Sequence, residues 1–156
     1  MGIKYKLYRN MEKQNISIVI ADYSKSPGPR YCYQGDDSGE DFYHKILNER
    51  FNDAFEQETD IEVNLDGPDG YASSFLDEAF GNLVFDFGFE NVQSRVKIIS
   101  NEEPEWIEMI EKETYVQWEE RRKNNQEPQK TIEHEEWSRY NFATNQTEKK
   151  KWISKK

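Results

Sequence analysis

Two adjacent serines, Ser73 and Ser74, occupy the sequence position best suited to chemistry in this chain. They follow a turn-forming stretch at residues 67–70 and precede apolar residues that recur every three or four positions as far as Phe87. A hydroxyl at the start of a helix can either cap the helix or remain free as an acceptor for a phosphoryl group. Because Asp77 follows Ser74 by three residues, which is close to a capping box, we expect Ser74 to cap the helix and Ser73 to lie just outside it.

Both serines are therefore candidate phosphoacceptors, with Ser73 the more accessible of the two. A phosphate there would add a charge of roughly −1.5 to −2, favoured by the helix dipole but opposed by nearby acidic side chains. A protein packed against this loop would experience the full change in charge, so modification is expected to act on binding more than on folding. The predicted partner-binding residues are Asp69, Gly70, Tyr71, Ser73, Phe75, Asp77 and Glu78.

A second candidate is an anion site in the glycine- and proline-rich loop that begins at Ser26. Arg30 and Ser38 could hold a phosphate at the start of the following helix. Acidic residues surround them, and the lysine–hydroxyl pair of a P-loop is absent from the sequence. The alternative interpretation of this stretch is a turn followed by a helix N-cap, in which acids near the helix start are favourable.

Catalytic and metal-binding motifs are not recognisable. A serine nucleophile needs a base, and neither His44 nor His134 lies in a motif that would supply one. His44 is expected to be an exposed polar residue, and His134 lacks the spacing of a zinc-binding HExxH motif. Cys32 is the only cysteine, which excludes an internal disulfide and a cysteine-rich metal site. We therefore predict a protein without catalytic residues, cofactor or metal.

The elements that position these residues follow from hydrophobic periodicity. Alternating or β-branched runs predict strands at residues 16–20, 61–65 and 96–99, with a weaker edge strand at 3–8. Apolar stripes predict helices at 42–57, 74–87 and 104–118. The expected fold is an α/β domain with a mixed sheet of about four strands, in which strand 16–20 is central and amphipathic helices pack against the sheet.

The chain is long enough for one domain, which we place at residues 1–123 with a core at 16–118. Residues 124–156 are expected to be an extension made of a polar linker, a short helix within 131–142 and a lysine-rich tail. The tail contains Lys149, Lys150, Lys151, Lys155 and Lys156.

The net charge of −10 disfavours sequence-independent nucleic-acid binding by the body of the chain. The lysine-rich tail is the exception: it could bind nucleic acid, dock on an acidic partner or simply be solvated. The sequence contains no apolar run of about 20 residues and no signal-peptide pattern, so we expect a soluble, cytoplasmic protein without a membrane segment.

The order of elements resembles the STAS domains of anti-anti-sigma factors and, more closely, small bacterial STAS-like proteins with the motif Ser-Ser-Phe-x-Asp-Glu-x-Phe-Gly-x-Leu. The motif matches Ser73, Ser74, Phe75, Asp77, Glu78, Phe80, Gly81 and Leu83, and the resemblance covers about residues 16–118. In anti-anti-sigma factors a serine in an Asp-Ser-Ser-Gly turn is phosphorylated by a histidine-kinase-like ATPase. The resemblance places Ser73 at that serine, although Ala72 replaces the aspartate and Phe75 the glycine.

The resemblance thus implies a non-enzymatic regulatory or adaptor protein. Its expected partner is an ATPase or kinase-like protein that binds the loop and helix around the two serines, under the control of serine phosphorylation. The alternative is a module that binds a nucleotide or small anion through Arg30, the proline–glycine loop and the Ser-Ser turn. The sequence does not predict an oligomeric state.

Overall fold

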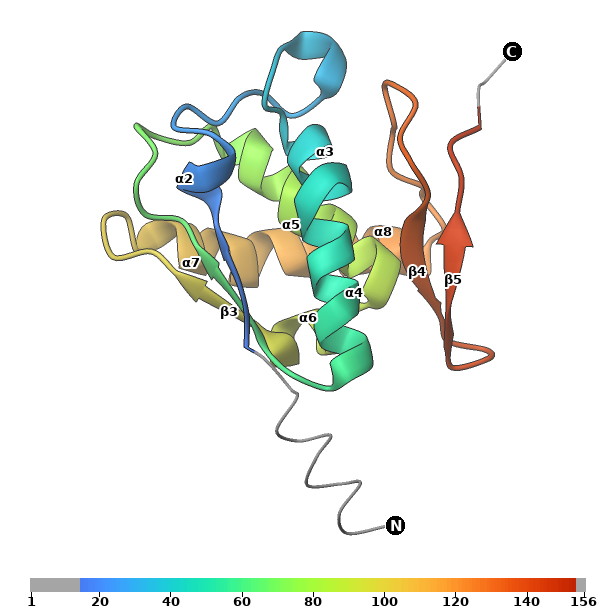
Figure 1. The fold of residues 1–156 in the computed structure, drawn as a ribbon. Helices are drawn as coiled ribbons and strands as arrows, with labels where there is room; N and C mark the ends of the chain where they lie inside the picture. Colours follow the sequence, from blue (N-terminus) through green and yellow to red (C-terminus); the bar gives the residue numbers. More distant parts are fainter. Residues whose placement is uncertain (1–14, 154–156) are drawn as a thin grey trace, which may run out of the picture.

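The computed structural model describes residues 15–153, which form an α/β fold around a small parallel sheet (Figure 1). The sheet contains β1 (Ile16–Val19), β2 (Ile61–Asn64) and β3 (Val96–Ile99) in the order β1-β2-β3. Ile61 pairs with Ile16 on one side and with Val96 on the other. The expected α/β class is confirmed, but within residues 15–153 this sheet is entirely parallel rather than mixed, and β2 rather than β1 is central. The edge strand expected at 3–8 lies outside the described residues.

Alternation along the strands determines which face of the sheet carries the core. Ile16, Ile18 and Val63 are buried, whereas Ser17 and Glu62 between them are exposed. This is the period-two pattern expected of strands with one face packed. Parallel strands require crossover connections, and both connections here contain helices.

The first crossover ends in one continuous helix made of α3 (Gly39–Phe42), η2 (Tyr43–Leu47) and α4 (Asn48–Gln57). Before it come α2 (Ile20–Tyr23), a long loop and the single turn η1 (Cys32–Gln34). The second crossover contains α5 (Ser73–Phe87) and α6 (Phe89–Arg95). After β3, a further helix is built from α7 (Glu105–Met109), η3 (Ile110–Thr114) and α8 (Tyr115–Lys123). The three long helices expected from periodicity are thus all present.

Helix α5 lies at the centre of the molecule, between α3 and α8 (Figure 1). Twelve of its 15 residues are buried, so it is enclosed on nearly all sides. Gly81 permits the close approach of α8, because a Cβ atom there would lie 2.1 Å from Cε2 of Trp118. Gly39 permits the close approach of α3 to α5, because a Cβ atom there would lie 2.4 Å from the carbonyl oxygen of Phe75.

The C-terminal segment differs from the expected short helix. It forms an antiparallel hairpin of β4 (Trp137–Asn141) and β5 (Gln146–Lys150), which packs beside α4 and α5 (Figure 1). The turn contains Asn145 in the left-handed region at φ 56°, a conformation that asparagine tolerates. Lys149 and Lys150 of the expected tail belong to β5 rather than to a free terminus. Among residues 15–153, no helix combines the length and apolar character needed to cross a membrane.

Candidate functional site

Ser73 lies at the exposed N-terminus of α5, at the carboxyl end of the central strand. It is the first residue of the helix and is exposed, while Ser74 is half-buried. The expectation that Ser74 caps the helix is wrong, because Ala72 occupies the N-cap position and provides no side-chain hydrogen bond. Asp77 does not complete a capping box; its carboxylate instead accepts hydrogen bonds from Arg30, Thr114 and Trp118.

The loop between β2 and α5 is held by backbone and side-chain contacts. The amide of Asp69 donates to the carbonyl of Lys25 at 2.8 Å, and Ser26 Oγ donates to the Asp69 carboxylate at 3.1 Å. Tyr71 donates its hydroxyl to the carbonyl of Leu65 at 2.6 Å. The loops that follow β1 and β2 therefore meet beside the start of α5, at the edge where functional groups gather in parallel sheets.

The predicted partner-binding residues divide by exposure. Asp69 and Ser73 are exposed, and Gly70, Tyr71 and Asp77 are half-buried. Phe75 and Glu78 are buried and support the helix from inside. The surface available to a partner is therefore the loop and the first turn of α5, which we call the Ser73 surface and define as residues 69–74 and Asp77.

Arg30 and Ser38, the predicted anion-binding residues, are both engaged within the protein. Nη1 of Arg30 lies 2.7 Å from Asp77 Oδ2 and 3.1 Å from Glu78 Oε1. Burial lowers the pKa of Arg30, but the two carboxylates outweigh it and the net shift is upward. Ser38 is fully buried, and its hydroxyl accepts a hydrogen bond from the amide of Asp41, as the N-cap of α3. The N-cap expected in the alternative interpretation of this stretch is therefore present.

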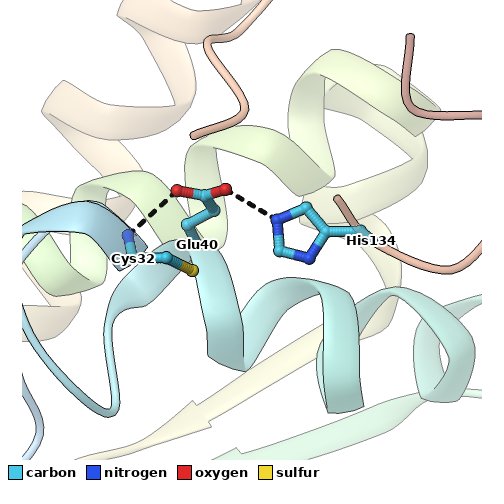
Figure 2. Close-up of side chains that lie close together, drawn as sticks. All are labelled: Cys32, Glu40 and His134. Atoms are coloured by element: carbon cyan, nitrogen blue, oxygen red, sulfur yellow. Dashed lines mark hydrogen bonds and ion pairs between the residues drawn. The ribbon is translucent and has the colours of Figure 1, made fainter. Parts of the chain in front are cut away.

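A second group of polar side chains surrounds the buried carboxylate of Glu40 (Figure 2). Glu40 accepts hydrogen bonds from the amide of Cys32 at 3.0 Å, and from the amide and hydroxyl of Thr131 at 2.8 and 2.6 Å. A further contact of the same carboxylate is with His134, whose Nε2 lies 2.6 Å from Oε2 of Glu40. Burial raises the pKa of Glu40, but the hydrogen bonds from His134, Thr131 and Cys32 outweigh it and lower the pKa to about 2. The carboxylate is thus ionised and fully partnered.

The two histidines lie together beside Glu40, although they are far apart in sequence. Their rings stack with centroids 3.9 Å apart and an interplanar angle of 12°. Both ring nitrogens of His44 are buried and lack a hydrogen-bond partner among the described residues, so the expectation of an exposed His44 is wrong. Burial lowers the pKa of His44, and the charges of Lys130 and His134 lower it further. Burial also raises the pKa of the Cys32 thiol to about 11.

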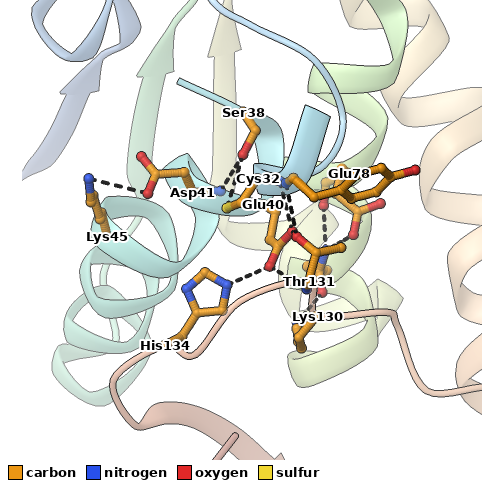
Figure 3. A network of polar contacts seen from close by, with 11 residues as sticks. Cys32, Ser38, Glu40, Asp41, Lys45, Glu78, Lys130, Thr131 and His134 are labelled. Atoms are coloured by element: carbon orange, nitrogen blue, oxygen red, sulfur yellow. Dashed lines mark hydrogen bonds and ion pairs between the residues drawn. The ribbon is translucent and has the colours of Figure 1, made fainter. Parts of the chain in front are cut away.

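A stripe of polar residues on α5 lies beside this network, and Figure 3 labels its first member, Glu78. Glu78, Asn82 and Asp86 are spaced four residues apart, and each is only 1% exposed. Asn82 accepts a hydrogen bond from Lys130 at 2.7 Å, and Asp86 accepts one from Arg139 at 2.7 Å. We call these three residues the α5 polar stripe. Two of its members, Asn82 and Asp86, bind the segment after α8 and strand β4.

Sequence reasoning did not find the Glu40 cluster or the polar stripe. The stripe has a signal that could have been used, since three polar residues at intervals of four interrupt the mainly apolar residues 75–87. The Glu40 cluster has no comparable signal, because its members come from η1, α3 and the segment before β4. Their proximity depends on how the C-terminal segment packs.

The comparison with protein families agrees with this architecture. Residues 38–106 match a family model described as a STAS-like domain of unknown function. The matched residues run from the start of α3 to α7 and include Ser73 and Ser74, which confirms the resemblance drawn from the Ser-Ser-Phe motif. No curated protein and no solved structure matches the chain significantly. The STAS-like assignment suggests a regulatory or binding role without identifying what is bound.

Proposed function

We propose that this protein is a non-enzymatic regulator that binds a protein partner through the Ser73 surface and is controlled by phosphorylation of Ser73. The observation that carries the proposal is the position of Ser73, exposed on the first turn of α5 at the carboxyl end of the central parallel strand. The partner class that the STAS-like resemblance favours is a histidine-kinase-like ATPase, which would both bind this surface and modify it.

The electrostatic surroundings of Ser73 are compatible with an added phosphate. Asp77, one turn along the helix, is paired with Arg30, so part of its repulsion toward a phosphate is compensated. The N-terminus of α5 has no side-chain cap, which leaves backbone amides of the first turn for an anion. In the proposed reaction the Ser73 hydroxyl oxygen attacks the γ-phosphorus of ATP, ADP leaves, and the hydroxyl proton passes to solvent.

The first test is phosphorylation by the native host. The purified protein is incubated with host lysate and ATP labelled at the γ-phosphate, and the labelled residue is mapped by mass spectrometry. Label is expected on the wild type and on Ser74→Ala, and none on Ser73→Ala. Label that persists on Ser73→Ala would assign the acceptor elsewhere.

The second test concerns binding. Immobilised wild type, Ser73→Glu and Ser94→Glu are compared for the proteins that they capture from the same lysate. Ser94 is a matched control because it is also an exposed helical serine but lies in α6. A partner should be captured by wild type and Ser94→Glu and strongly depleted on Ser73→Glu. Equal capture by all three would contradict a switch at Ser73.

The anion-binding alternative is separated from this proposal by thermal shift. A nucleotide present at 100 times its dissociation constant would stabilise the protein by about 2.7 kcal/mol. The internal contacts of Arg30 and Ser38 lead us to expect no stabilisation by ATP, GTP or GDP alone.

A further inference from the structure

We propose that Cys32, Glu40 and His134 form a binding site for a divalent zinc ion that fastens the C-terminal segment to α3. This inference is independent of the role of Ser73. The Sγ atom of Cys32, a carboxylate oxygen of Glu40 and a ring nitrogen of His134 all lie within 4.8 Å of one another. Figure 2 shows the three side chains converging from η1, α3 and the segment before β4.

The separations of the ligand atoms bracket those that a tetrahedral ion needs, with 2.6 Å between His134 and Glu40 and at most 4.8 Å across the three residues. Zinc binds sulfur at about 2.3 Å and nitrogen or oxygen at about 2.0–2.2 Å, so neighbouring ligand atoms lie roughly 3.3–3.6 Å apart. The contact of 2.6 Å between His134 Nε2 and Glu40 Oε2 would open by less than about 1 Å to admit the ion. Side-chain rotation without movement of the helices provides a displacement of this size.

The charge and chemistry of the three ligands favour zinc over a hard cation. A thiolate and a carboxylate together balance the two positive charges of the ion, and the neutral imidazole adds none, so the site would be neutral as burial requires. Sulfur and imidazole ligands suit zinc, whereas magnesium and calcium prefer oxygen. On binding, the Cys32 thiol releases its proton to solvent, and His134 coordinates through the Nε2 lone pair with its ring proton on Nδ1.

Residues around the ligands would orient them. Thr131 donates two hydrogen bonds to the Glu40 carboxylate, and the Cys32 amide donates a third. Ser38 Oγ lies 3.3 Å from Cys32 Sγ. Ligating side chains in metal proteins are commonly fixed by such outer contacts. Three protein ligands leave a fourth coordination position for water.

The test uses the full-length, tag-free protein after treatment with a chelator. Cobalt(II) is titrated as a spectroscopic substitute for zinc, because a cobalt–thiolate bond produces a charge-transfer absorption and a tetrahedral site produces intense visible bands. We expect one cobalt ion per chain, displacement of cobalt by zinc, and a higher melting temperature in the presence of zinc. Absence of stoichiometric cobalt binding by the folded wild type would overturn the proposal.

Variants then assign the ligands. Cys32→Ser should lose the charge-transfer band and the thermal shift, while His44→Phe, which removes the neighbouring histidine outside the ligand set, should keep both. Thr131→Val leaves the three ligands in place and should weaken zinc binding about 10–100-fold. Cobalt spectra that are the same in Cys32→Ser and wild type would show that any metal binds elsewhere. Circular dichroism of each variant verifies that it has folded.

Discussion

The ion pair between Arg139 and Asp86 is the contact whose removal should most destabilise the attachment of the hairpin. Nε of Arg139 lies 2.7 Å from Asp86 Oδ1, and the side chains are only 13% and 1% exposed. After the substitution Arg139→Met, the buried carboxylate would keep, among residues 15–153, the hydrogen bond from the Tyr43 hydroxyl. Breaking a buried pair on one side costs about 3–5 kcal/mol when the remaining charge has no compensation. Because the charge of Lys130 also interacts with Asp86, we expect the lower end of this range. This is a large part of the 5–15 kcal/mol that typically stabilises a domain.

Equilibrium unfolding in urea measures this loss as a lower midpoint at an unchanged slope. The matched control is Lys112→Met, which breaks an i,i+4 pair with Glu108 whose side chains are 74% and 69% exposed and should cost less than about 1 kcal/mol. Adding Asp86→Asn to Arg139→Met should recover part of the loss by removing the uncompensated charge. If Arg139→Met costs no more than Lys112→Met, the reasoning about this buried pair is refuted.

Three further predictions follow from local contacts. Gly81→Ala should cost about 1–3 kcal/mol and shift the tryptophan fluorescence, because the added Cβ would collide with Trp118; a variant with unchanged fluorescence and stability would contradict this close packing. Ser38→Ala should lower the free energy of unfolding by about 0.5–2 kcal/mol, since it removes the cap of α3. Ser74→Ala should lower it by less than about 0.5 kcal/mol, and a larger loss for Ser74→Ala than for Ser38→Ala in thermal melts would show that Ser74 caps α5. In the presence of a chelator, Cys32 should react with iodoacetamide about 10-fold more slowly at neutral pH than an ordinary cysteine. Its pKa is raised from 9.0 to about 11, which lowers the thiolate fraction, although the greater nucleophilicity of the more basic thiolate offsets part of that loss; mass spectrometry gives the rate, and reaction at the ordinary rate would exclude the raised pKa.

The order of elements around the sheet could be predicted from sequence because each has a strong local signal. A strand places alternate residues on one face, so the alternating pairs Ile16 and Ile18, and Val63 and Leu65, predict strands with one buried face. The apolar residues of α5 repeat with the period of a helix. Whether the sheet is parallel or mixed depends on pairing between distant segments, which these signals do not contain. For this reason the expected positions of the three strands are correct, whereas the expected mixed sheet is wrong and the sheet is parallel.

The hairpin and the cap were mispredicted for a different reason. Trp137 and Tyr140 are three residues apart and fit a helix as well as a strand, so only pairing with β5 distinguishes the two. Ser74 and Asp77 satisfy a local capping pattern, but Asp77 has stronger partners in Arg30 and Trp118. In both cases a long-range contact prevailed over a local preference. The exposure of Ser73 was inferred from its position before the helix, and its exposure is confirmed although it lies inside the helix.

The α5 polar stripe also determines how the C-terminal segment can be placed. A segment held only by apolar side chains can shift along a helix at modest cost, because one aliphatic contact replaces another. Here Lys130 and Arg139 must meet Asn82 and Asp86 respectively, and a shift by a single residue would leave those buried groups unpaired. Sequence insertions between Lys130 and Arg139 should therefore be accommodated as bulges away from α5, whereas insertions in the β4–β5 turn should leave the attachment unchanged.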